Sequence, residues 1–129
     1  MRKIKLLMVG LGRVGGTFYQ KFNEIAPEHI DIVAVSEPNL ANPILEKVKE
    51  SGIPNYPDVK EAVQAYGEEI DIIVDTSNNA EVKVTIRKIL QETNNRHTVL
   101  LPMIVDYLIW YLLPDAEPIE QSHHKDIGY

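Results

Sequence analysis

The chain has 129 residues, the length of one domain, and carries 13 lysines and arginines against 19 aspartates and glutamates, a net charge of −6. It has no basic cluster, which argues against nucleic acid or an anionic membrane as a partner, because both attract positive charge. Without cysteine, the chain has no disulfide, thiolate metal site or cysteine nucleophile, and we expect a cytoplasmic protein.

The first half of the chain alternates strand and helix signals. Ile4–Val9 is a short aliphatic run ended by glycine, which favours a buried strand over a signal peptide. Apolar residues then recur at helical spacing: Val14, Phe18, Phe22 and Ile25. Residues 30–35 form a second β-branched run, and capping signals predict a helix over residues 43–51.

The second half continues this alternation. Residues 53–56 predict only a marginal strand, because a proline within them cannot donate a hydrogen bond. A helix follows, with the apolar positions Val59, Ala62, Val63 and Tyr66. Residues 70–74 predict a strand, and Asn78 or Asn79 can cap a helix whose inner face is Val82, Ile86, Ile89 and Leu90. Residues 97–101 predict the last strand.

Strands that alternate with helices predict a fold class. Short connections between them favour a parallel sheet with helices on both faces, a three-layer, doubly wound α/β fold of the Rossmann type. We assign residues 1–113 to this single domain and residues 114–129 to a polar tail that packs on a partner subunit or on its own domain. Such a sheet binds ligands at the carboxyl ends of its strands.

A glycine motif stands at the first of these strand ends. The segment is Gly10-Leu11-Gly12-Arg13-Val14-Gly15, which reads G-x-G-x-x-G between a strand and a helix. Gly10 permits the tight turn, Gly12 lets the backbone approach a pyrophosphate, and Gly15 lets helix and strand pack closely. Amides at the helix start favour a phosphate, and Arg13 lies either beside it or in solvent.

An acidic residue follows the second strand. Glu37 stands 22 residues beyond Gly15, where a carboxylate accepts hydrogen bonds from ribose hydroxyls and repels the 2′-phosphate of NADP. This predicts an NAD site, with NADP disfavoured. The alternative is a glycine turn that only packs a helix on a strand, with Glu37 as a solvated loop residue.

Three stretches of the chain carry a family resemblance: residues 9–15, residues 33–39 and residues 71–82. Over about residues 3–101 the chain resembles the N-terminal NAD(P)-binding domain shared by homoserine and aspartate dehydrogenases and the glucose–fructose oxidoreductase family. The resemblance implies that Ser36 and Glu37 contact the cofactor, and that further contacts on its nicotinamide side come from Thr76, Ser77 and Asn78. Considered without the resemblance, the latter segment is typical of a strand exit and helix cap.

The chain also departs from this family. In the glucose–fructose oxidoreductase group the fifth strand ends in Glu-Lys-Pro, whose lysine works at the reacting carbon, whereas this chain has Leu100-Leu101-Pro102. An aliphatic side chain cannot transfer a proton, so we do not expect that group's chemistry. From the 129 residues we also expect the family's second domain to be absent.

The run that starts at Met103 and ends at Leu113 is apolar on nearly all sides, with Asp106 as its one charged residue. It is shorter than the roughly 20 residues of a membrane span and lacks the basic residues of an interfacial anchor. We therefore predict a homodimer through this helix, with three aromatic anchors: Tyr107, Trp110 and Tyr111. The alternative is that the polar tail folds back over the helix.

The remaining titratable residues give weaker signals. His123 and His124 complete no metal-ligand pattern, so we predict no metal site, although a tail histidine could reach a neighbour's cleft as an acid or base. We interpret His97 and Asp106 as structural. The sequence thus predicts an NAD(H)-binding, dehydrogenase-like module that works as a homodimer; the alternative is a compact NAD(P)-dependent oxidoreductase with its active site at the dimer interface.

Overall fold

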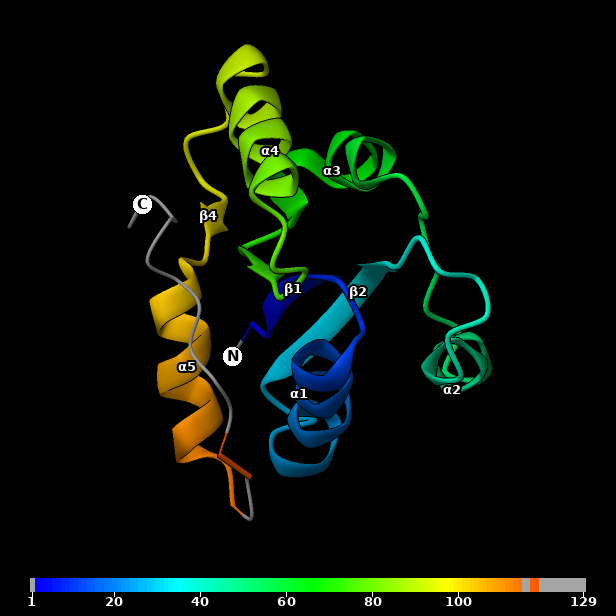
Figure 1. Cartoon of the computed structure of the whole chain (residues 1–129). Helices are drawn as coiled ribbons and strands as arrows, with labels where there is room; N and C mark the ends of the chain where they lie inside the picture. The colour runs from blue at the N-terminus through cyan, green and yellow to red at the C-terminus, as the bar shows by residue number, and fades with distance from the viewer. Residues whose placement is uncertain (1, 115–116, 119–129) are drawn as a thin grey trace.

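The sheet is parallel throughout. A computed structural model describes residues 2–114 and 117–118, and in them four strands lie in the order β2-β1-β3-β4. Their bounds are β1 (Ile4–Val9), β2 (Ile30–Ser36), β3 (Ile72–Asp75) and β4 (Val99–Leu100). The chain leaves β1 for β2 on one side and later returns for β3 on the other, so the strand order reverses at β1 (Figure 1).

The helices follow the predicted periodicity. They are α1 (Arg13–Ile25), α2 (Ile44–Glu50), α3 (Val59–Tyr66), α4 (Ala80–Glu92) and α5 (Met103–Leu112), with a short 3₁₀ helix, η1 (Gly67–Glu69), after α3. Asp58 caps α3 by accepting a hydrogen bond from Lys60 N at 2.9 Å. Asn79, rather than Asn78, caps α4 by accepting one from Glu81 N at 3.0 Å.

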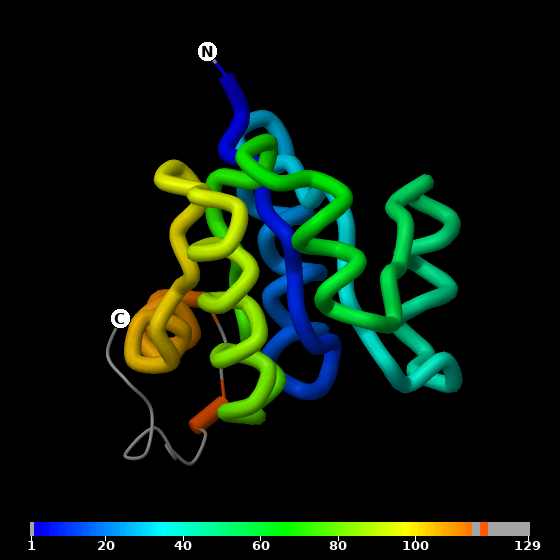
Figure 2. Tube along the Cα trace, turned by 90° about the horizontal axis from the view of Figure 1, so that it is seen from above, coloured from blue at the N-terminus to red at the C-terminus, as the bar shows by residue number. Residues whose placement is uncertain are grey.

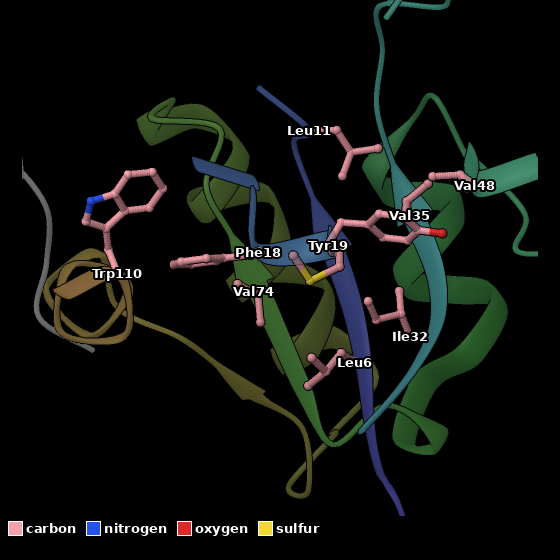
Figure 3. Close-up of a cluster of buried hydrophobic side chains, with 10 residues drawn as sticks. Leu6, Leu11, Phe18, Tyr19, Ile32, Val35, Val48, Val74 and Trp110 are labelled. Carbon is pink, nitrogen blue, oxygen red and sulfur yellow. The ribbon is translucent and has the colours of Figure 1, made fainter. Parts of the chain in front are cut away.

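Helices cover both faces of the sheet, which confirms the predicted three-layer Rossmann-type fold. Alternate residues of β1 point to opposite faces, because side chains along a strand alternate. One face packs on α1, α2 and α5 in the cluster of Figure 3: Leu6, Met8, Leu11, Phe18, Tyr19, Ile32, Val35, Val48, Val74 and Trp110. The other packs on α3 and α4: Leu7, Val9, Ala34, Ala62, Val63, Ile70, Ile73, Ile86 and Ile89. Figure 2 shows α1 and the pair α3 and α4 on opposite sides of β1.

Two predicted strands were wrong in extent. Residues 53–56 form no strand: only Asn55 makes an isolated bridge, to Val35, because Pro54 has no N–H to continue a ladder. The last strand is two residues long instead of five. The N–H groups of His97 and Thr98 bond to Asn95 Oδ1, 3.0 Å away in each case, and are thereby withdrawn from the sheet.

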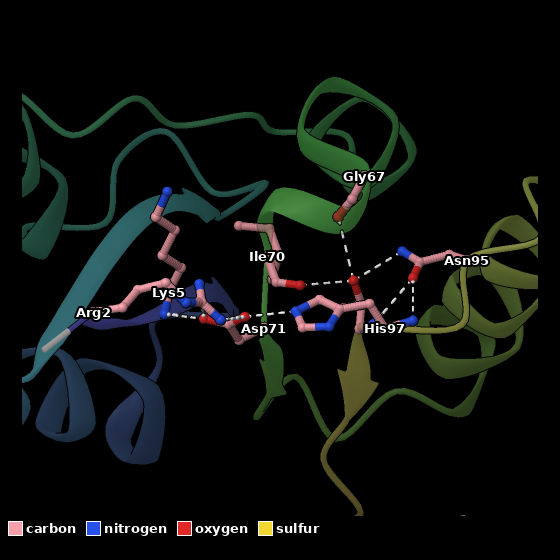
Figure 4. Close-up of polar contacts among 8 residues, drawn as sticks. Arg2, Lys5, Gly67, Ile70, Asp71, Asn95 and His97 are labelled. Atoms are coloured by element: carbon pink, nitrogen blue, oxygen red, sulfur yellow. Dashed lines mark hydrogen bonds and ion pairs between the residues drawn. The ribbon is translucent and has the colours of Figure 1, made fainter.

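A carboxylate ties the amino ends of three strands together (Figure 4). Asp71 accepts hydrogen bonds from Arg2 Nη2 at 2.7 Å and from Lys5 N at 2.8 Å, and its Oδ1 lies 2.6 Å from Nε2 of His97. The Arg2 side chain, with the Lys5 amide next, holds the pKa of Asp71 well below its ordinary value of 3.8. His97, which we interpreted as structural, thus belongs to a contact between the segments before β1, β3 and β4.

Helix α5 lies at the β4 edge of the sheet and has one buried side (Figure 1). Tyr107 and Trp110 are 6% and 3% exposed, and the Trp110 ring lies 6.2 Å from that of Phe18, centroid to centroid. Of the three aromatic anchors predicted for a dimer, only Tyr111 is exposed, at 53%. The expectation for Tyr107 and Trp110 was therefore wrong, because the hydrophobic core of their own chain takes up both rings.

The opposite side of α5 is apolar and exposed, with Ile104, Leu108, Tyr111 and Leu112 each at least half accessible. Trp110 Nε1 donates a hydrogen bond to the carbonyl oxygen of Glu117, 2.6 Å away, so this described part of the polar tail contacts the chain's own helix. Among the described helices, none has the length and hydrophobicity of a membrane-spanning segment.

Candidate nucleotide-binding site

A cleft of about 330 Å³ opens where β1, β2 and β3 end, beside the reversal in strand order. Its walls come from the glycine turn, from the exits of β2 and β3, and from the first turns of α3 and α4. The lining residues are Val9, Gly10, Gly12, Ser36, Glu37, Pro38, Val59, Thr76, Ser77, Asn79 and Val82. This is the position at which doubly wound sheets bind ligands.

The glycine turn has the geometry predicted for it. Gly10 has φ +85°, a backbone conformation that favours glycine. A Cβ at Gly15 would collide with the carbonyl oxygen of Gly10 and with Thr76 Oγ1, so only glycine lets α1 pack this closely. Among the described residues, a Cβ at Gly12 would meet no atom within 4 Å, and no side chain caps the N-terminus of α1 there. The first amides of α1 thus remain available to an anion.

Glu37 is buried, which overturns its interpretation as a solvated loop residue. It is 7% exposed, and its Oε1 accepts hydrogen bonds from Leu11 N at 2.8 Å and from Asn42 Nδ2 at 3.3 Å. Its Oε2 accepts one from Asn39 N at 2.8 Å. The carboxylate therefore fixes the glycine turn from the end of β2. Each carboxylate oxygen has two lone pairs, so Oε2 retains capacity for a further donor.

The remaining motif residues point elsewhere. The Leu11 side chain is 1% exposed in the core, and Val14 packs against the same cluster, so neither side chain lines the cleft. Arg13 is exposed and forms an ion pair with Glu117, with 3.1 Å between Nη2 and Oε2. None of these three predicted cofactor-binding residues has a side chain that lines the cleft: the Leu11 amide bonds to Glu37, and the other two supply the first amides of α1.

The exit of β3 supplies the opposite wall. Thr76 Oγ1 donates a hydrogen bond to the carbonyl oxygen of Gly10 over 3.1 Å, which joins this wall to the glycine turn. Ser77 lines the cleft, and its buried Oγ has no hydrogen-bond partner among the described residues. Asn78 is exposed with φ +54° and does not line the cleft, whereas Asn79 does. A buried hydroxyl without a partner fits a polar ligand group.

Sequence reasoning missed an ion pair beneath this wall. Lys83 Nζ lies 3.0 Å from Asp75 Oδ2, and both side chains are almost fully buried. Asp75 Oδ1 accepts a hydrogen bond from Ser77 N at 2.9 Å. One signal was present: Lys83 precedes Ile86 by three positions and so shares the inner face of α4, where a charge needs a partner.

In the described ranges, no three histidine, aspartate or glutamate side chains are arranged to hold a metal ion. His123 and His124 lie outside the described residues. Among the described lining residues, Glu37 alone is ionisable.

Fold and cleft define a Rossmann-type α/β domain, and solved structures share this fold. The scyllo-inositol dehydrogenase of Lactobacillus casei superposes with a TM-score of 0.52 at 18% identity, and the myo-inositol 2-dehydrogenase of Lactobacillus plantarum with 0.51 at 17%. Each match covers 80% of this chain and 37% of the dehydrogenase, so this chain spans little more than a third of their length. No protein-family model matches the chain, and no curated protein sequence does.

These neighbours support the Rossmann-type fold that the resemblance implies, and the family itself stays a prediction. The resemblance to homoserine and aspartate dehydrogenases stays a prediction.

Proposed function

We propose that this chain binds a nicotinamide dinucleotide, NAD(H) in preference to NADP(H), in the cleft at the carboxyl ends of β1, β2 and β3. The observation that carries the proposal is the N-terminus of α1, which no described side chain caps and which opens beside Gly12 with free space at its Cα. Phosphate oxygens are the ligands that such a helix start favours, because its amides have no other acceptor and its dipole attracts negative charge.

The walls of the cleft suit the two chemical parts of an adenosine. Pro38, Val59 and Val82 offer apolar surface for a base, and Glu37 offers Oε2 to ribose hydroxyls. A buried carboxylate at this place repels a 2′-phosphate, which favours NAD(H) over NADP(H). Ser77 Oγ offers a further hydrogen bond. When bound, the dinucleotide would supply hydride-transfer chemistry.

The same lining favours binding over catalysis. Glu37 is the one ionisable group among the described lining residues, and its carboxylate already accepts backbone hydrogen bonds. General acid–base chemistry requires a titratable group within hydrogen-bond reach of the substrate. We therefore propose a cofactor-binding or regulatory module, or a subunit that another chain completes. The alternative, a compact oxidoreductase with its site at a dimer interface, predicts NADH formation with hydroxy-acid, amino-acid or polyol substrates.

We further propose that the module is a homodimer through the exposed face of α5. This face presents Ile104, Leu108, Tyr111 and Leu112 on successive turns of one helix. A two-fold axis across it would pair the face with itself and remove its apolar surface from water. Light scattering should give twice 14.6 kDa for the wild type and 14.6 kDa for Leu108→Glu. A monomeric wild type would contradict the dimer without touching the cofactor site.

A fluorescence titration with NADH tests the cofactor proposal. We expect saturable binding, with NADPH at least about tenfold weaker. Gly12→Val should lose NADH affinity and keep the thermal midpoint, because its side chain enters free space where the phosphates would lie. Gly67→Val lies outside the cleft-lining residues and is the control for a loss of stability: its positive φ strains a valine, yet NADH binding by the folded fraction should be unchanged. No binding at millimolar NADH would overturn the proposal.

A further inference from the structure

The ion pair between Asp75 and Lys83 is not explained by stability alone. The two residues are 0% and 3% exposed, with 3.0 Å between the charged atoms. The desolvation penalty of burying two charges offsets much of the free energy gained from their attraction. An apolar pair of similar volume would therefore stabilise the fold about as well. A buried pair of this kind needs a second reason, and its contacts indicate one.

Asp75 connects the pair with the wall of the cleft. Its Oδ2 faces Lys83, while its Oδ1 accepts the Ser77 N–H bond of 2.9 Å. The backbone of Ser77 lies directly against the glycine turn. If Gly10 carried a Cβ atom, that atom would be only 3.1 Å from the Cα and N atoms of Ser77. A shift of Ser77 would therefore shift Gly10 or open a gap beside it.

Lys83 holds the carboxylate in this orientation. The ammonium reaches from α4 to the end of β3, and its Nζ also lies 3.5 Å from the carbonyl oxygen of Leu101, after β4. If the Asp75 carboxylate rotated away from Ser77, it would leave a buried ammonium without its counter-charge, which the interior disfavours strongly. The rotamer of Asp75 is thus fixed by a partner outside the cleft.

We propose that Asp75 and Lys83 are positioning residues of the cleft. The ion pair holds the Ser77 backbone, and through it the glycine turn, in the arrangement that receives the dinucleotide. The identity of the ligand rests on the function proposed above, whereas the positioning is a property of the protein without ligand. Ser77, which lines the cleft, is the residue whose place the pair sets.

Two double variants separate positioning from stability. Asp75→Asn/Lys83→Met removes both charges and keeps an oxygen that can accept the Ser77 N–H bond, whereas Asp75→Leu/Lys83→Met removes this acceptor as well. Neither leaves a buried charge, so both are expected to fold. In the free proteins, hydrogen exchange is compared at the bonded amides of Ser77, Gly10 and Leu11. Exchange should be about tenfold faster in the variant without the acceptor than in Asp75→Asn/Lys83→Met, and the NADH Kd about tenfold higher. Asp75→Asn/Lys83→Met, which keeps the acceptor but loses the ion pair, should itself exchange faster than the wild type.

Equal exchange rates in the two variants would overturn the positioning role of Asp75, whatever their NADH affinity. Exchange in Asp75→Asn/Lys83→Met as slow as in the wild type would overturn the role of the ion pair with Lys83. If exchange differs as expected while the wild type binds no NADH, the positioning stands and the proposed function fails. If the variant without the acceptor does not fold, hydrogen exchange of the wild-type protein tests the proposal instead. Its Ser77 amide should exchange about a hundredfold more slowly than the same amide in an unstructured chain. Exchange at the unstructured rate would overturn the proposal.

Discussion

Both ends of the sheet hold carboxylates, but the one at the amino end joins strands, whereas those at the carboxyl end fix the loops beside the cleft. At the amino end, Asp71 joins side chains from distant segments, with the Arg2 guanidinium at 2.7 Å and the His97 imidazole at 2.6 Å. At the carboxyl end, Glu37 and Asp75 accept hydrogen bonds from backbone amides of the loops that line the cleft. One end ties strands together, and the other fixes loop backbones.

The two ends also differ in what they leave unsatisfied. The described contacts of Asp71 involve both of its oxygens and three segments of the chain. At the carboxyl end, the start of α1 has no side-chain cap and Ser77 Oγ has no partner among the described residues. Polar groups left without protein partners beside a cleft are what a ligand can satisfy, so this difference separates the stabilising end from the binding end.

The largest expected effect tests the carboxyl end. Lys83→Met leaves the Asp75 carboxylate buried and without its ammonium, and should reduce the free energy of unfolding by about 3–5 kcal/mol. Urea denaturation measures the loss, and Asp75→Asn/Lys83→Met should recover most of it. A single variant as stable as the wild type would mean that water reaches the Asp75 carboxylate.

The next largest effect is expected when the two glycines Gly12 and Gly15 of one turn are each replaced by alanine. Gly15→Ala should cost about 1–3 kcal/mol of stability, because its methyl group meets the Gly10 backbone and Thr76. Gly12→Ala should stay within about 0.5 kcal/mol of the wild type, since its methyl group enters free space. Thermal denaturation of both proteins gives the comparison, and equal midpoints would contradict the close packing of α1 on the turn.

A pH series tests the amino end. The lowered pKa of Asp71 means that the folded state keeps this carboxylate charged at a pH where the unfolded chain takes up a proton. Its contribution is therefore fully present above the ordinary value of 3.8 and is lost as the pH falls toward the lowered pKa. The stability difference between the wild type and Asp71→Asn should shrink steadily below that value. A difference independent of pH would rule out the charged contact.

The smallest effect is expected outside both ends. Arg13 and Glu117 form an exposed ion pair, with side chains 59% and 81% accessible. Such pairs contribute little, because water and salt screen them, so Arg13→Ala should change stability by less than about 1 kcal/mol. Its NADH affinity, measured at low and high salt, then decides whether Arg13 lies beside the pyrophosphate. A salt-independent loss of affinity would argue against that electrostatic role.

Local patterns predicted most of the fold. The apolar spacing of α1, α3 and α4, the β-branched runs of β1 and β2, and the caps Asp58 and Asn79 depend on neighbours within a few residues. The strand predictions were wrong where a distant or competing contact determined the backbone structure. Residues 53–56 make one isolated bridge instead of a strand, and the His97 amide bonds to Asn95 instead of to the sheet.

The residues of the candidate site also divide into those that the sequence predicts and those that only the tertiary structure shows. Gly10, Gly15 and Glu37 could be predicted because a turn and a strand exit have a known spacing. Burial of Glu37 against the Leu11 amide could not, since the two lie 26 residues apart in sequence and meet only when β1 and β2 pair. For the same reason, periodicity predicts Tyr107 and Trp110 as dimer anchors, and only the tertiary structure shows that both are buried in their own chain.

The sequence by itself determined the alternation of strands and helices, the place of the glycine turn and the acid that follows the second strand, because each depends on short-range spacing. Only the tertiary structure decided which groups meet at the carboxyl end. Asp75, Ser77 and Lys83 are close in sequence, yet the ion pair became visible only once α4 folded back over β3 and removed both charges from water.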